Sequence, residues 1–312
     1  MRNAFAKQLT DTAVDDPSVV LLSGDIGNRM FDDFKRLCPG RFFNCGVAEA
    51  NMLSVAAGMA MSGLRPVVYT IAPFITVRCL EQIRVDVCYH NAPVLIVGVG
   101  GGLSYASLGP THHSCEDIAM LRVLPRMQVI CPGDAWEVRS AVKAVLANPE
   151  PTYLRLGKKG EPLVHASEPE FERGRGITIR TGKDMVVLST GNLLPLAVEA
   201  VDRLNEQGVS AGVVSLHTVK PLDCDLLTEC FGSVKLVATL EEHSILGGLG
   251  GAVAEWLADQ SPPQARLLRL GTEDRFLSEA GNQSHAREQF KLDADSLVAS
   301  LAKAFGHAIA QH

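Results

Sequence analysis

Short apolar runs alternate with longer amphipathic segments through the first half of the chain. The runs have the length and composition of strands buried on both faces of a sheet, and they lie at residues 18–24, 65–70, 93–98, 128–131 and 152–155. Helical patterns separate or precede them at residues 1–14, 49–61, 76–89, 114–124 and 135–146. This alternation predicts parallel strands joined by helices.

The same alternation returns after a polar stretch in the middle of the chain. Residues 161–182 are rich in charge, proline and glycine, which is typical of a linker. Apolar runs follow at residues 184–190, 211–215, 234–239 and 266–270, and helical patterns at 194–207, 225–231 and 249–259. We therefore predict two doubly wound α/β domains, the first with a mostly parallel sheet over residues 1–172 and the second over residues 173–312.

Composition and charge narrow the class of protein. With 46% hydrophobic residues in 312, the chain can bury a large core and is not expected to be disordered. A net charge of −6 argues against nucleic acid or an anionic membrane as the main partner, because both favour a basic face. No apolar run approaches the roughly 20 residues of a transmembrane helix, and residues 1–14 lack the apolar core of a signal peptide. We expect a cytoplasmic protein.

The eight cysteines are scattered among apolar residues without a C-x-x-C pair. This distribution is typical of reduced, mostly buried thiols. His112, His113 and Cys115 lie close together in sequence and raise the alternative of a structural zinc site. They lack a second pair of ligands at a recognisable spacing, so no metal ligand is assigned to this chain.

Residues 42–51, with the sequence FFNCGVAEAN, place Glu49 between a predicted strand and a predicted helix. Phe42 and Phe43 favour the strand, and Gly46 ends it. A glutamate in the first turn of a helix is usually exposed and is favoured by the helix dipole. Here the neighbours are small or apolar, and a buried carboxylate would need a hydrogen-bond donor from elsewhere, such as a ligand. The sequence leaves both interpretations open.

Two glycine-rich loops follow predicted strands. Residues 98–110 (GVGGGLSYASLGP) lie at the carboxyl end of a parallel strand, where α/β folds bind ligands. A mobile surface connection is the alternative, and as a phosphate-binding fingerprint the loop is weak because no helix follows it at once. Residues 241–251 (EEHSILGGLGG) open a helix whose N-terminus could attract an anion or another subunit.

Three motifs in a fixed order resemble the thiamine diphosphate-dependent transketolase family: GVAEANM at 46–52, LGPTHHSCEDIAMLRVLP at 108–125 and EEHSILGGLGGAVAE at 241–255. The resemblance runs through essentially the whole chain, but it covers only the pyrimidine-binding and C-terminal domains of such an enzyme. The chain therefore resembles the C-terminal subunit of a split transketolase. A partner subunit would supply the diphosphate-binding domain with its Gly-Asp-Gly motif, which we do not find in this sequence.

The resemblance implies a cofactor and a reaction. Thiamine diphosphate would bind with Mg²⁺ or Ca²⁺, whose ligands would lie on the partner subunit. Glu49 matches the glutamate that hydrogen-bonds a nitrogen of the cofactor's aminopyrimidine and so promotes proton loss from its thiazolium carbon. The implied reaction transfers a two-carbon ketol unit from a ketose (phosphate) donor to an aldose acceptor.

The resemblance also assigns roles to other side chains. Phe74 is the candidate that stacks on the pyrimidine, although an ordinary core position would fit this phenylalanine equally well. His112 matches a residue beside the aminopyrimidine and the substrate oxygen, where it can donate a hydrogen bond to developing charge. Asp25 matches an acidic residue near the cofactor and the domain interface.

Three arginines are further candidates. Arg155 matches an arginine that binds the sugar phosphate, a task for which a guanidinium group is well suited. We expect Arg78 to assist in binding the cofactor and Arg29 in binding the substrate, with a surface or structural charge as the alternative for both.

Two departures from the family pattern bear on the substrate. Leu108 stands where the family usually has an aspartate that contacts a substrate hydroxyl, and Gly100–Gly102 stand where it tends to have a histidine. A site built for a hydroxyl discriminates strongly through that contact. We therefore expect a sugar other than the common pentose phosphates, such as a modified, deoxy or larger one.

The implied assembly is an α2β2 tetramer in which this chain also contacts its own copy. The nearest alternatives are a deoxyxylulose-phosphate synthase-like enzyme, which uses pyruvate, and the β subunit of a 2-oxo acid dehydrogenase. A non-catalytic assembly subunit is an alternative of another class. A nucleotide-binding protein built on Gly98–Gly102 has the least support.

Overall fold

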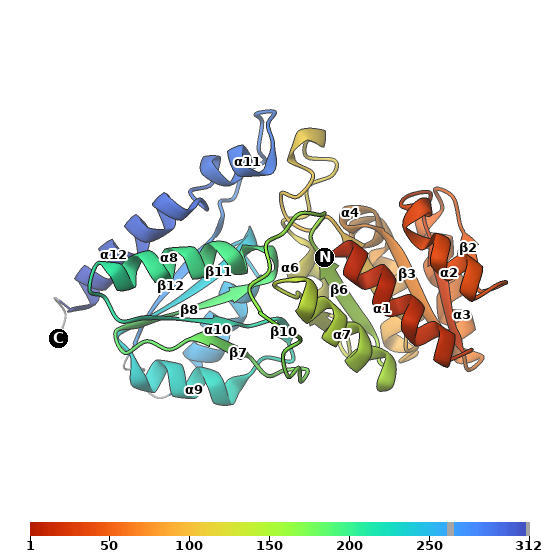
Figure 1. Cartoon of the computed structure of the whole chain (residues 1–312), viewed down its shortest axis with the longest axis horizontal. Helices are drawn as coiled ribbons and strands as arrows, with labels where there is room; N and C mark the ends of the chain where they lie inside the picture. The colour runs from red at the N-terminus through yellow and green to blue at the C-terminus, as the bar shows by residue number, and fades with distance from the viewer. Residues whose placement is uncertain (261–264, 310–312) are drawn as a thin grey trace.

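The structure, a computed structural model, describes residues 1–260 and 265–309. Two α/β units stand side by side in Figure 1, the first half of the chain in red to yellow-green and the second in green to blue. The amino terminus lies near the junction of the units, and the last helix runs to the far edge of the second. The predicted fold class is confirmed, whereas the boundary between residues 172 and 173 stays a prediction.

A seven-stranded sheet forms the first unit, in the order β10-β5-β6-β4-β3-β1-β2. Its strands are β1 (Val19–Ser23), β2 (Phe42–Asn44), β3 (Arg65–Ile71), β4 (Leu95–Val99), β5 (Gln128–Ile130), β6 (Thr152–Leu156) and β10 (Thr218–Lys220). All neighbours are parallel except β10, which runs antiparallel to β5. Because β10 comes from the second half of the chain, it ties that half to the first sheet.

The helical segments of the first half are α1 (Arg2–Asp15), η1 (Asn28–Phe31), α2 (Asp32–Leu37), α3 (Glu49–Met61), α4 (Ala72–Ile75), η2 (Val77–Cys79), α5 (Leu80–Gln82), η3 (Ile83–Tyr89), η4 (Ala106–Leu108), α6 (Asp117–Arg122) and α7 (Ala135–Ala147). The helix predicted over 76–89 is in fact a 3-10 turn, a short α-helical turn and a π-helical stretch. The helix predicted over 114–124 shortens to α6.

Helices cover both faces of this sheet because successive strand residues point to opposite sides. Leu21 and Val67 join α1, α2 and α7 in one apolar cluster. Leu22 and Val68 join α3, η3 and α6 in another. Both faces of the sheet are therefore buried, as the unbroken apolar runs predicted.

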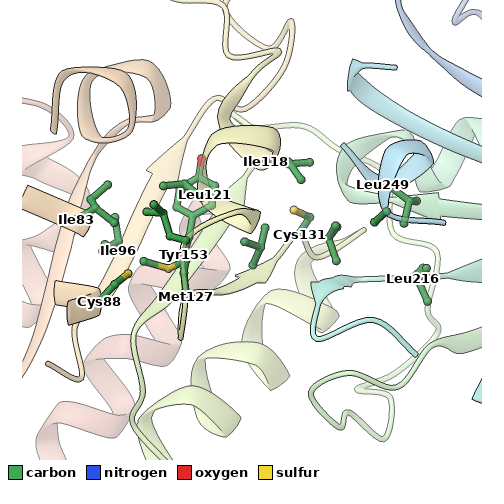
Figure 2. Packing of buried hydrophobic residues seen from close by; sticks show 14 of the residues in the cluster. Ile83, Cys88, Ile96, Ile118, Leu121, Met127, Cys131, Tyr153, Leu216 and Leu249 are labelled. Carbon is green, nitrogen blue, oxygen red and sulfur yellow. The ribbon is translucent and has the colours of Figure 1, made fainter. Parts of the chain in front are cut away.

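One hydrophobic core crosses the junction of the two units. Figure 2 shows it running from Ile83 and Ile96 in the first unit, past Tyr153 and Cys131, to Leu249 in the second. All five side chains are buried. A continuous apolar contact of this kind favours one fixed arrangement of the units over independent motion.

The second unit contains a five-stranded sheet in the order β12-β11-β8-β9-β7. Its strands are β7 (Ile177–Arg180), β8 (Met185–Thr190), β9 (Ala211–Ser215), β11 (Leu236–Ser244) and β12 (Arg266–Thr272). Edge strand β7 is antiparallel to β9, and the other pairs are parallel. Its helical segments are η5 (Gly191–Leu193), α8 (Leu194–Glu206), α9 (Cys224–Ser233), α10 (Leu249–Ala258), α11 (Gln283–Gln289) and α12 (Ala294–Ile309).

Candidate active site

Glu49 is the first residue of α3, which begins directly after a tight turn. Gly46 has a φ of +63°, a conformation that favours glycine, and its N–H donates to Asn44 Oδ1 at 2.9 Å. The turn aims the chain from β2 into α3 and carries the Glu49 carboxylate inward, where it is only 4% exposed. The N-terminal end of the helix dipole favours a negative charge at this position.

Arg78 supplies the hydrogen-bond donor that the local sequence around Glu49 lacks. Its Nη1 lies 2.8 Å from Glu49 Oε2, and its side chain is 46% exposed. Of the two interpretations that the sequence left open, the buried carboxylate is therefore the one observed. Burial and the Glu49 charge together raise the pKa of the adjacent Cys79 thiol to about 12, so this cysteine stays protonated beside the carboxylate.

Three rings and the Arg78 guanidinium form a continuous surface beside Glu49. The guanidinium carbon of Arg78 lies 4.5 Å from the centre of the half-buried Phe74 ring. Phe74 meets His112 edge to face, with ring centres 5.1 Å apart. The ring centres of Tyr105 and His112 are 6.2 Å apart. The structure therefore brings the predicted residues Glu49, Phe74, Arg78 and His112 together.

His112 is held in a form suited to hydrogen bonding. Burial lowers its pKa, and the neighbouring His113 lowers it further, so the neutral imidazole is favoured at neutral pH. Its Nδ1 lies 2.9 Å from Thr111 Oγ1. A neutral imidazole has one N–H donor and one acceptor, so one ring nitrogen can form a hydrogen bond with Thr111 while the other is available to a ligand.

A groove of about 610 Å³ opens beside these residues. Phe74, Arg78 and Thr111 line it from the first unit, and Phe276 lines it from the second. Phe276 is 77% exposed, whereas phenylalanine side chains are usually buried. The second unit therefore contributes an aromatic wall to the groove.

Arg155 does not lie in this groove, which corrects the prediction that it binds a sugar phosphate. It is 3% exposed, and its Nε donates to Asp117 Oδ2 at 2.8 Å. Its Nη2 donates to the carbonyl oxygens of Ser114 and Glu242, at 2.8 and 2.9 Å. These bonds occupy the guanidinium inside the junction of the two units, so Arg155 joins the units and we do not retain a ligand role for it.

Asp25 and Arg29 lie on the segment that follows β1. Asp25 is exposed, accepts from Asn44 Nδ2 at 3.1 Å and donates its backbone N–H to Gly46 O at 3.0 Å. It therefore supports the turn that leads into Glu49. Arg29 is exposed on the 3-10 turn η1. Their predicted contacts with cofactor and substrate stay predictions.

The glycine loop after β4, which is a weak phosphate-binding fingerprint, packs against protein groups. Gly100 and Gly102 have φ values of +79° and +65°. A Cβ at Gly100 would overlap the Tyr105 ring, and a Cβ at Gly102 would overlap Glu242. Close packing of the loop therefore accounts for these glycines.

The helix N-terminus predicted to attract an anion is occupied by a carboxylate of the same chain. The N–H groups of Leu249 and Gly250, at the start of α10, donate to Glu241 at 2.6 and 2.8 Å. Burial raises the pKa of Glu241 to about 7, although these two bonds oppose the rise. The end of the helix is thus satisfied internally.

Neither a metal site nor a membrane span is found in the described part of the chain. Within residues 1–260 and 265–309, no group of three or more His, Cys, Asp or Glu side chains is placed to hold a metal ion. His113 instead lies 3.3 Å from the carbonyl oxygen of Ala106. Over the same ranges, no helix is long and apolar enough to cross a membrane.

The sequence did not reveal the polar cluster beneath the glycine loop. Glu242 is fully buried and accepts from the Leu103 N–H at 2.8 Å, and also from Asn192, Gln283 and Arg287. The only local indication of this cluster in the sequence is the pair of adjacent acids Glu241 and Glu242. Its partners come from distant segments and cannot be deduced from that signal.

Lys158 was also missed. It follows β6, and its Nζ lies 4.7 Å from the centre of the Tyr105 ring. Tyr105 in turn contacts His112. Lys158 is therefore a basic side chain at this end of β6 that lies against the surface formed by the three rings and Arg78. Arg155, the residue predicted from the sequence, lies within the same strand. The alternation of side chains along a strand does not show whether a residue faces the interior or the rim of the sheet.

Comparisons with known proteins agree with this architecture. The family described as transketolase, pyrimidine binding domain, matches residues 1–161, and the transketolase C-terminal domain matches residues 174–297. An apulose-4-phosphate transketolase subunit of Phocaeicola vulgatus is 35% identical over 298 residues, which cover 95% of this chain and 94% of that protein. The 6-deoxy-6-sulfo-D-fructose transketolase subunit SqwH of a Clostridium species is 34% identical over 299 residues, covering 96% and 92%.

Two further similarities extend the comparison. A solved structure described as a split gene transketolase, inactive beta4 tetramer, superposes with a TM-score of 0.87 at 36% identity and covers 98% of this chain and 97% of its own. The 1-deoxy-D-xylulose-5-phosphate synthase of Chlorobium luteolum is 34% identical over 288 residues, which cover 91% of this chain but 45% of that enzyme. The chain belongs to the transketolase family and contains its pyrimidine-binding and C-terminal domains.

Proposed function

We propose that this chain supplies the pyrimidine-binding half of a thiamine diphosphate-dependent transketolase site, in which Glu49 activates the aminopyrimidine. The observation that carries this proposal is a carboxylate only 4% exposed at the start of a helix, beside an aromatic ring and a neutral imidazole. A buried carboxylate without a permanent buried partner is poised to share a proton with a ligand.

The chemistry of these side chains fits an aminopyrimidine. The Glu49 carboxylate can accept a hydrogen bond from a protonated ring nitrogen, and the half-buried Phe74 ring offers a face on which a flat heterocycle can stack. When bound, thiamine diphosphate supplies the electron sink that lets a carbon–carbon bond break next to a carbonyl. Holding a proton between Glu49 and the ring nitrogen is this chain's contribution to that chemistry.

His112 has a separate proposed role. Its lowered pKa keeps it neutral, so it can donate a hydrogen bond to a substrate oxygen that gains negative charge. Its ring meets that of Phe74, which lines the groove. Asp25 would act indirectly, through the turn before Glu49.

A partner subunit would complete the site. The names of the relatives from Phocaeicola vulgatus and Clostridium describe subunits, and the two family matches of this chain are the pyrimidine-binding and C-terminal domains. We propose that the partner holds the diphosphate and its Mg²⁺ or Ca²⁺. The assembly would be an α2β2 tetramer in the cytoplasm that contains a contact between two copies of this chain.

Two positions outside the groove lining support a substrate that differs from the common pentose phosphates. Leu108 is 52% exposed at the end of η4, so the position lacks the polar group expected for a sugar hydroxyl. Gly100 packs under Tyr105 and leaves no side chain for the substrate. We propose a modified, deoxy or larger sugar, and wild-type activity typical of the family with xylulose 5-phosphate and ribose 5-phosphate would contradict this.

A deoxyxylulose-phosphate synthase-like reaction is the second candidate, supported by the similarity to the Chlorobium luteolum enzyme. The two candidates differ in the donor, because the synthase-like reaction consumes pyruvate and releases carbon dioxide. Incubating the assembled complex with pyruvate and an aldose phosphate separates them. Carbon dioxide release would favour the synthase, and transfer from a ketose donor alone would favour the transketolase.

The proposed function is tested by reconstitution. This chain is purified alone and together with a diphosphate-domain subunit, and binding of thiamine diphosphate with Mg²⁺ is measured by calorimetry before a screen of ketose donors. We expect binding and ketol transfer only in the mixture, and loss of transfer in Glu49→Gln. Undiminished transfer by Glu49→Ala would instead favour a non-catalytic assembly subunit.

A further inference from the structure

The loop that carries His112 is closed at its foot and exposed at its tip. Gly102 and Ser114 exchange two backbone hydrogen bonds, both of 2.9 Å, and so enclose residues 103–113. Both residues of this foot are buried, whereas Leu108 near the tip is 52% exposed. The position of His112 therefore depends on the groups that hold the buried part of the loop.

A series of hydrogen-bonded turns connects the foot of the loop to His112. The Ala106 N–H donates to the carbonyl oxygen of Leu103 at 2.9 Å, and the Gly109 N–H donates to that of Ala106 at 3.1 Å. The His112 N–H then donates to the carbonyl oxygen of Gly109 at 3.0 Å. Because these turns follow one another without a gap, a shift of the foot is carried to the imidazole.

Glu242 of the second unit holds this foot. Its Oε1 accepts from the Leu103 N–H at 2.8 Å, and a Cβ at Gly102 would overlap Glu242, so the two segments are in close contact. Its carbonyl oxygen accepts from Arg155 Nη2, which also donates to the carbonyl oxygen of Ser114. Glu242 is thus linked to both ends of the loop, directly and through one arginine.

Three side chains of the second unit fix the Glu242 carboxylate. Asn192 Nδ2 and Gln283 Nε2 donate to Oε1 at 3.1 and 2.9 Å, and Arg287 Nε donates to Oε2. Asn192 and Gln283 also donate to Ser104 Oγ, at 3.1 and 3.4 Å. Helix α11, which carries Gln283 and Arg287, lies beside the loop in Figure 1. A fully buried carboxylate with this many donors is a rigid support, because it cannot move without breaking several hydrogen bonds.

We propose that Glu242 is a positioning residue of the active site, which from the second unit holds the foot of this loop and thereby sets the position of His112. This inference rests on the proposed function and adds to it a role for the second unit in the reaction. Glu242 is fully buried, so it acts through the loop rather than by contact with a ligand.

Two effects of removing the support follow from this arrangement. A misplacement of about 1 Å can cost on the order of 10²-fold in rate, so the loss should appear in kcat. The affinity for the cofactor should stay the same, because Glu49 and Phe74 lie on α3 and α4 and not on the loop. Burial lowers the pKa of His112, so a loosened loop that admits water should raise this pKa toward 6.5.

The first measurement is an NMR titration of the histidine rings of the full chain alone, with the His112 signal assigned from His112→Asn. The test variant is Glu242→Ala, and Gln283→Ala is a milder one that keeps the carboxylate but removes a donor shared with Ser104. Glu241→Ala is the matched control, because Glu241 is the adjacent buried acid and accepts from α10 instead of the loop. Circular dichroism confirms the folding of each variant.

The second measurement uses the complex of the full chain with its diphosphate-domain subunit. Calorimetry gives the affinity for thiamine diphosphate with Mg²⁺, and transfer from a ketose donor gives kcat and KM. We expect Glu242→Ala to raise the pKa of His112 toward 6.5 and to lower kcat by about 10- to 10²-fold at unchanged cofactor affinity. Gln283→Ala should cause smaller changes in the same directions, and Glu241→Ala should cause neither.

Two results would overturn the positioning role: the same pKa of His112 in wild type, Glu242→Ala and Gln283→Ala, or an equal loss of kcat in Glu241→Ala and Glu242→Ala. A wild-type complex that binds no cofactor would instead refute the proposed function. The titration of the chain alone needs no cofactor, so it would still support or overturn the hold of Glu242 on the loop.

Discussion

A structural role of Arg155 can be distinguished by experiment from the sugar-phosphate-binding role that the sequence predicts. Arg155 is 3% exposed and Asp117 is fully buried, and the two are joined at 2.8 Å. Tyr153 also donates to Asp117, at 2.6 Å. Burial raises the pKa of Asp117, but the Arg155 charge and these hydrogen bonds outweigh it, so the pKa lies below its usual range and the pair is ionised.

Replacing Arg155 by alanine removes the positive member of this buried pair. The Asp117 carboxylate would lose its counter-charge, and the carbonyl groups of Ser114 and Glu242 would lose their donor. Breaking a buried pair in this way costs about 3–5 kcal/mol in the free energy of unfolding. For 312 residues that cost corresponds to a decrease in Tm of about 5–8 °C.

Urea unfolding and thermal unfolding of the full chain measure this change. Arg155→Lys keeps the charge but not the fork of donors, so we expect an intermediate loss. Arg180→Ala breaks an exposed arginine–carboxylate pair and should cost at most about 1 kcal/mol. An Arg155→Ala chain with wild-type stability, but with a KM for a sugar phosphate raised tenfold or more, would refute the structural role and restore the predicted ligand role.

Two other predictions concern buried groups. Glu242→Ala removes the acceptor that the Leu103 N–H and the side chains of Asn192, Gln283 and Arg287 share. It should lower the free energy of unfolding by about 2–4 kcal/mol and speed amide hydrogen exchange in residues 98–110. Unchanged exchange would contradict the coupling of this loop to the second unit. Burial lowers the pKa of His217 from 6.5 to about 4, so the unfolded chain binds more protons between these values and stability decreases as the pH falls. The free energy of unfolding should therefore fall by about 2 kcal/mol between pH 7 and pH 5 because of this histidine. Urea unfolding of His217→Asn should show a smaller decrease over the same pH range.

The sequence predicts the sheets better than their edges. Apolar runs identified the strands that are buried on both faces, because burial demands unbroken hydrophobic sequence. Edge strand β7 has no such apolar run, because it alternates between exposed and half-buried residues. Strand β10 is mostly buried but is too short to give a recognisable pattern. That β10 joins the first sheet depends on a contact between segments far apart in sequence, which no local pattern encodes.

Helix prediction failed where tertiary packing overrides periodicity. Residues 76–89 have a helical pattern, yet they form 3-10, α-helical and π-helical turns in succession. This departure bears on function, because Arg78 lies in the first of these turns and reaches Glu49. Helices α11 and α12 were missed, although Asn282 caps the first of them by accepting from the His285 N–H.

The site was predictable in type but not in detail. Glu49 stood out because a carboxylate followed a strand break among apolar neighbours, and the structure buries it. Its pairing with Arg78 joins residues 29 positions apart and could not be read from spacing. Arg155 was misassigned because a basic residue at the end of a strand can point into the interior or toward the rim, and only the fold decides which.

The most direct measurement of the central claim is the rate at which the thiazolium C–H of bound thiamine diphosphate exchanges with deuterium. It is followed by NMR after acid quenching, in the complex of this chain with its diphosphate-domain subunit, for wild type and Glu49→Gln. Calorimetry first establishes that cofactor is bound in both. If Glu49 activates the aminopyrimidine, Glu49→Gln should slow exchange by about 10²- to 10⁴-fold. Exchange at the same rate in both complexes, with cofactor bound, would contradict the account.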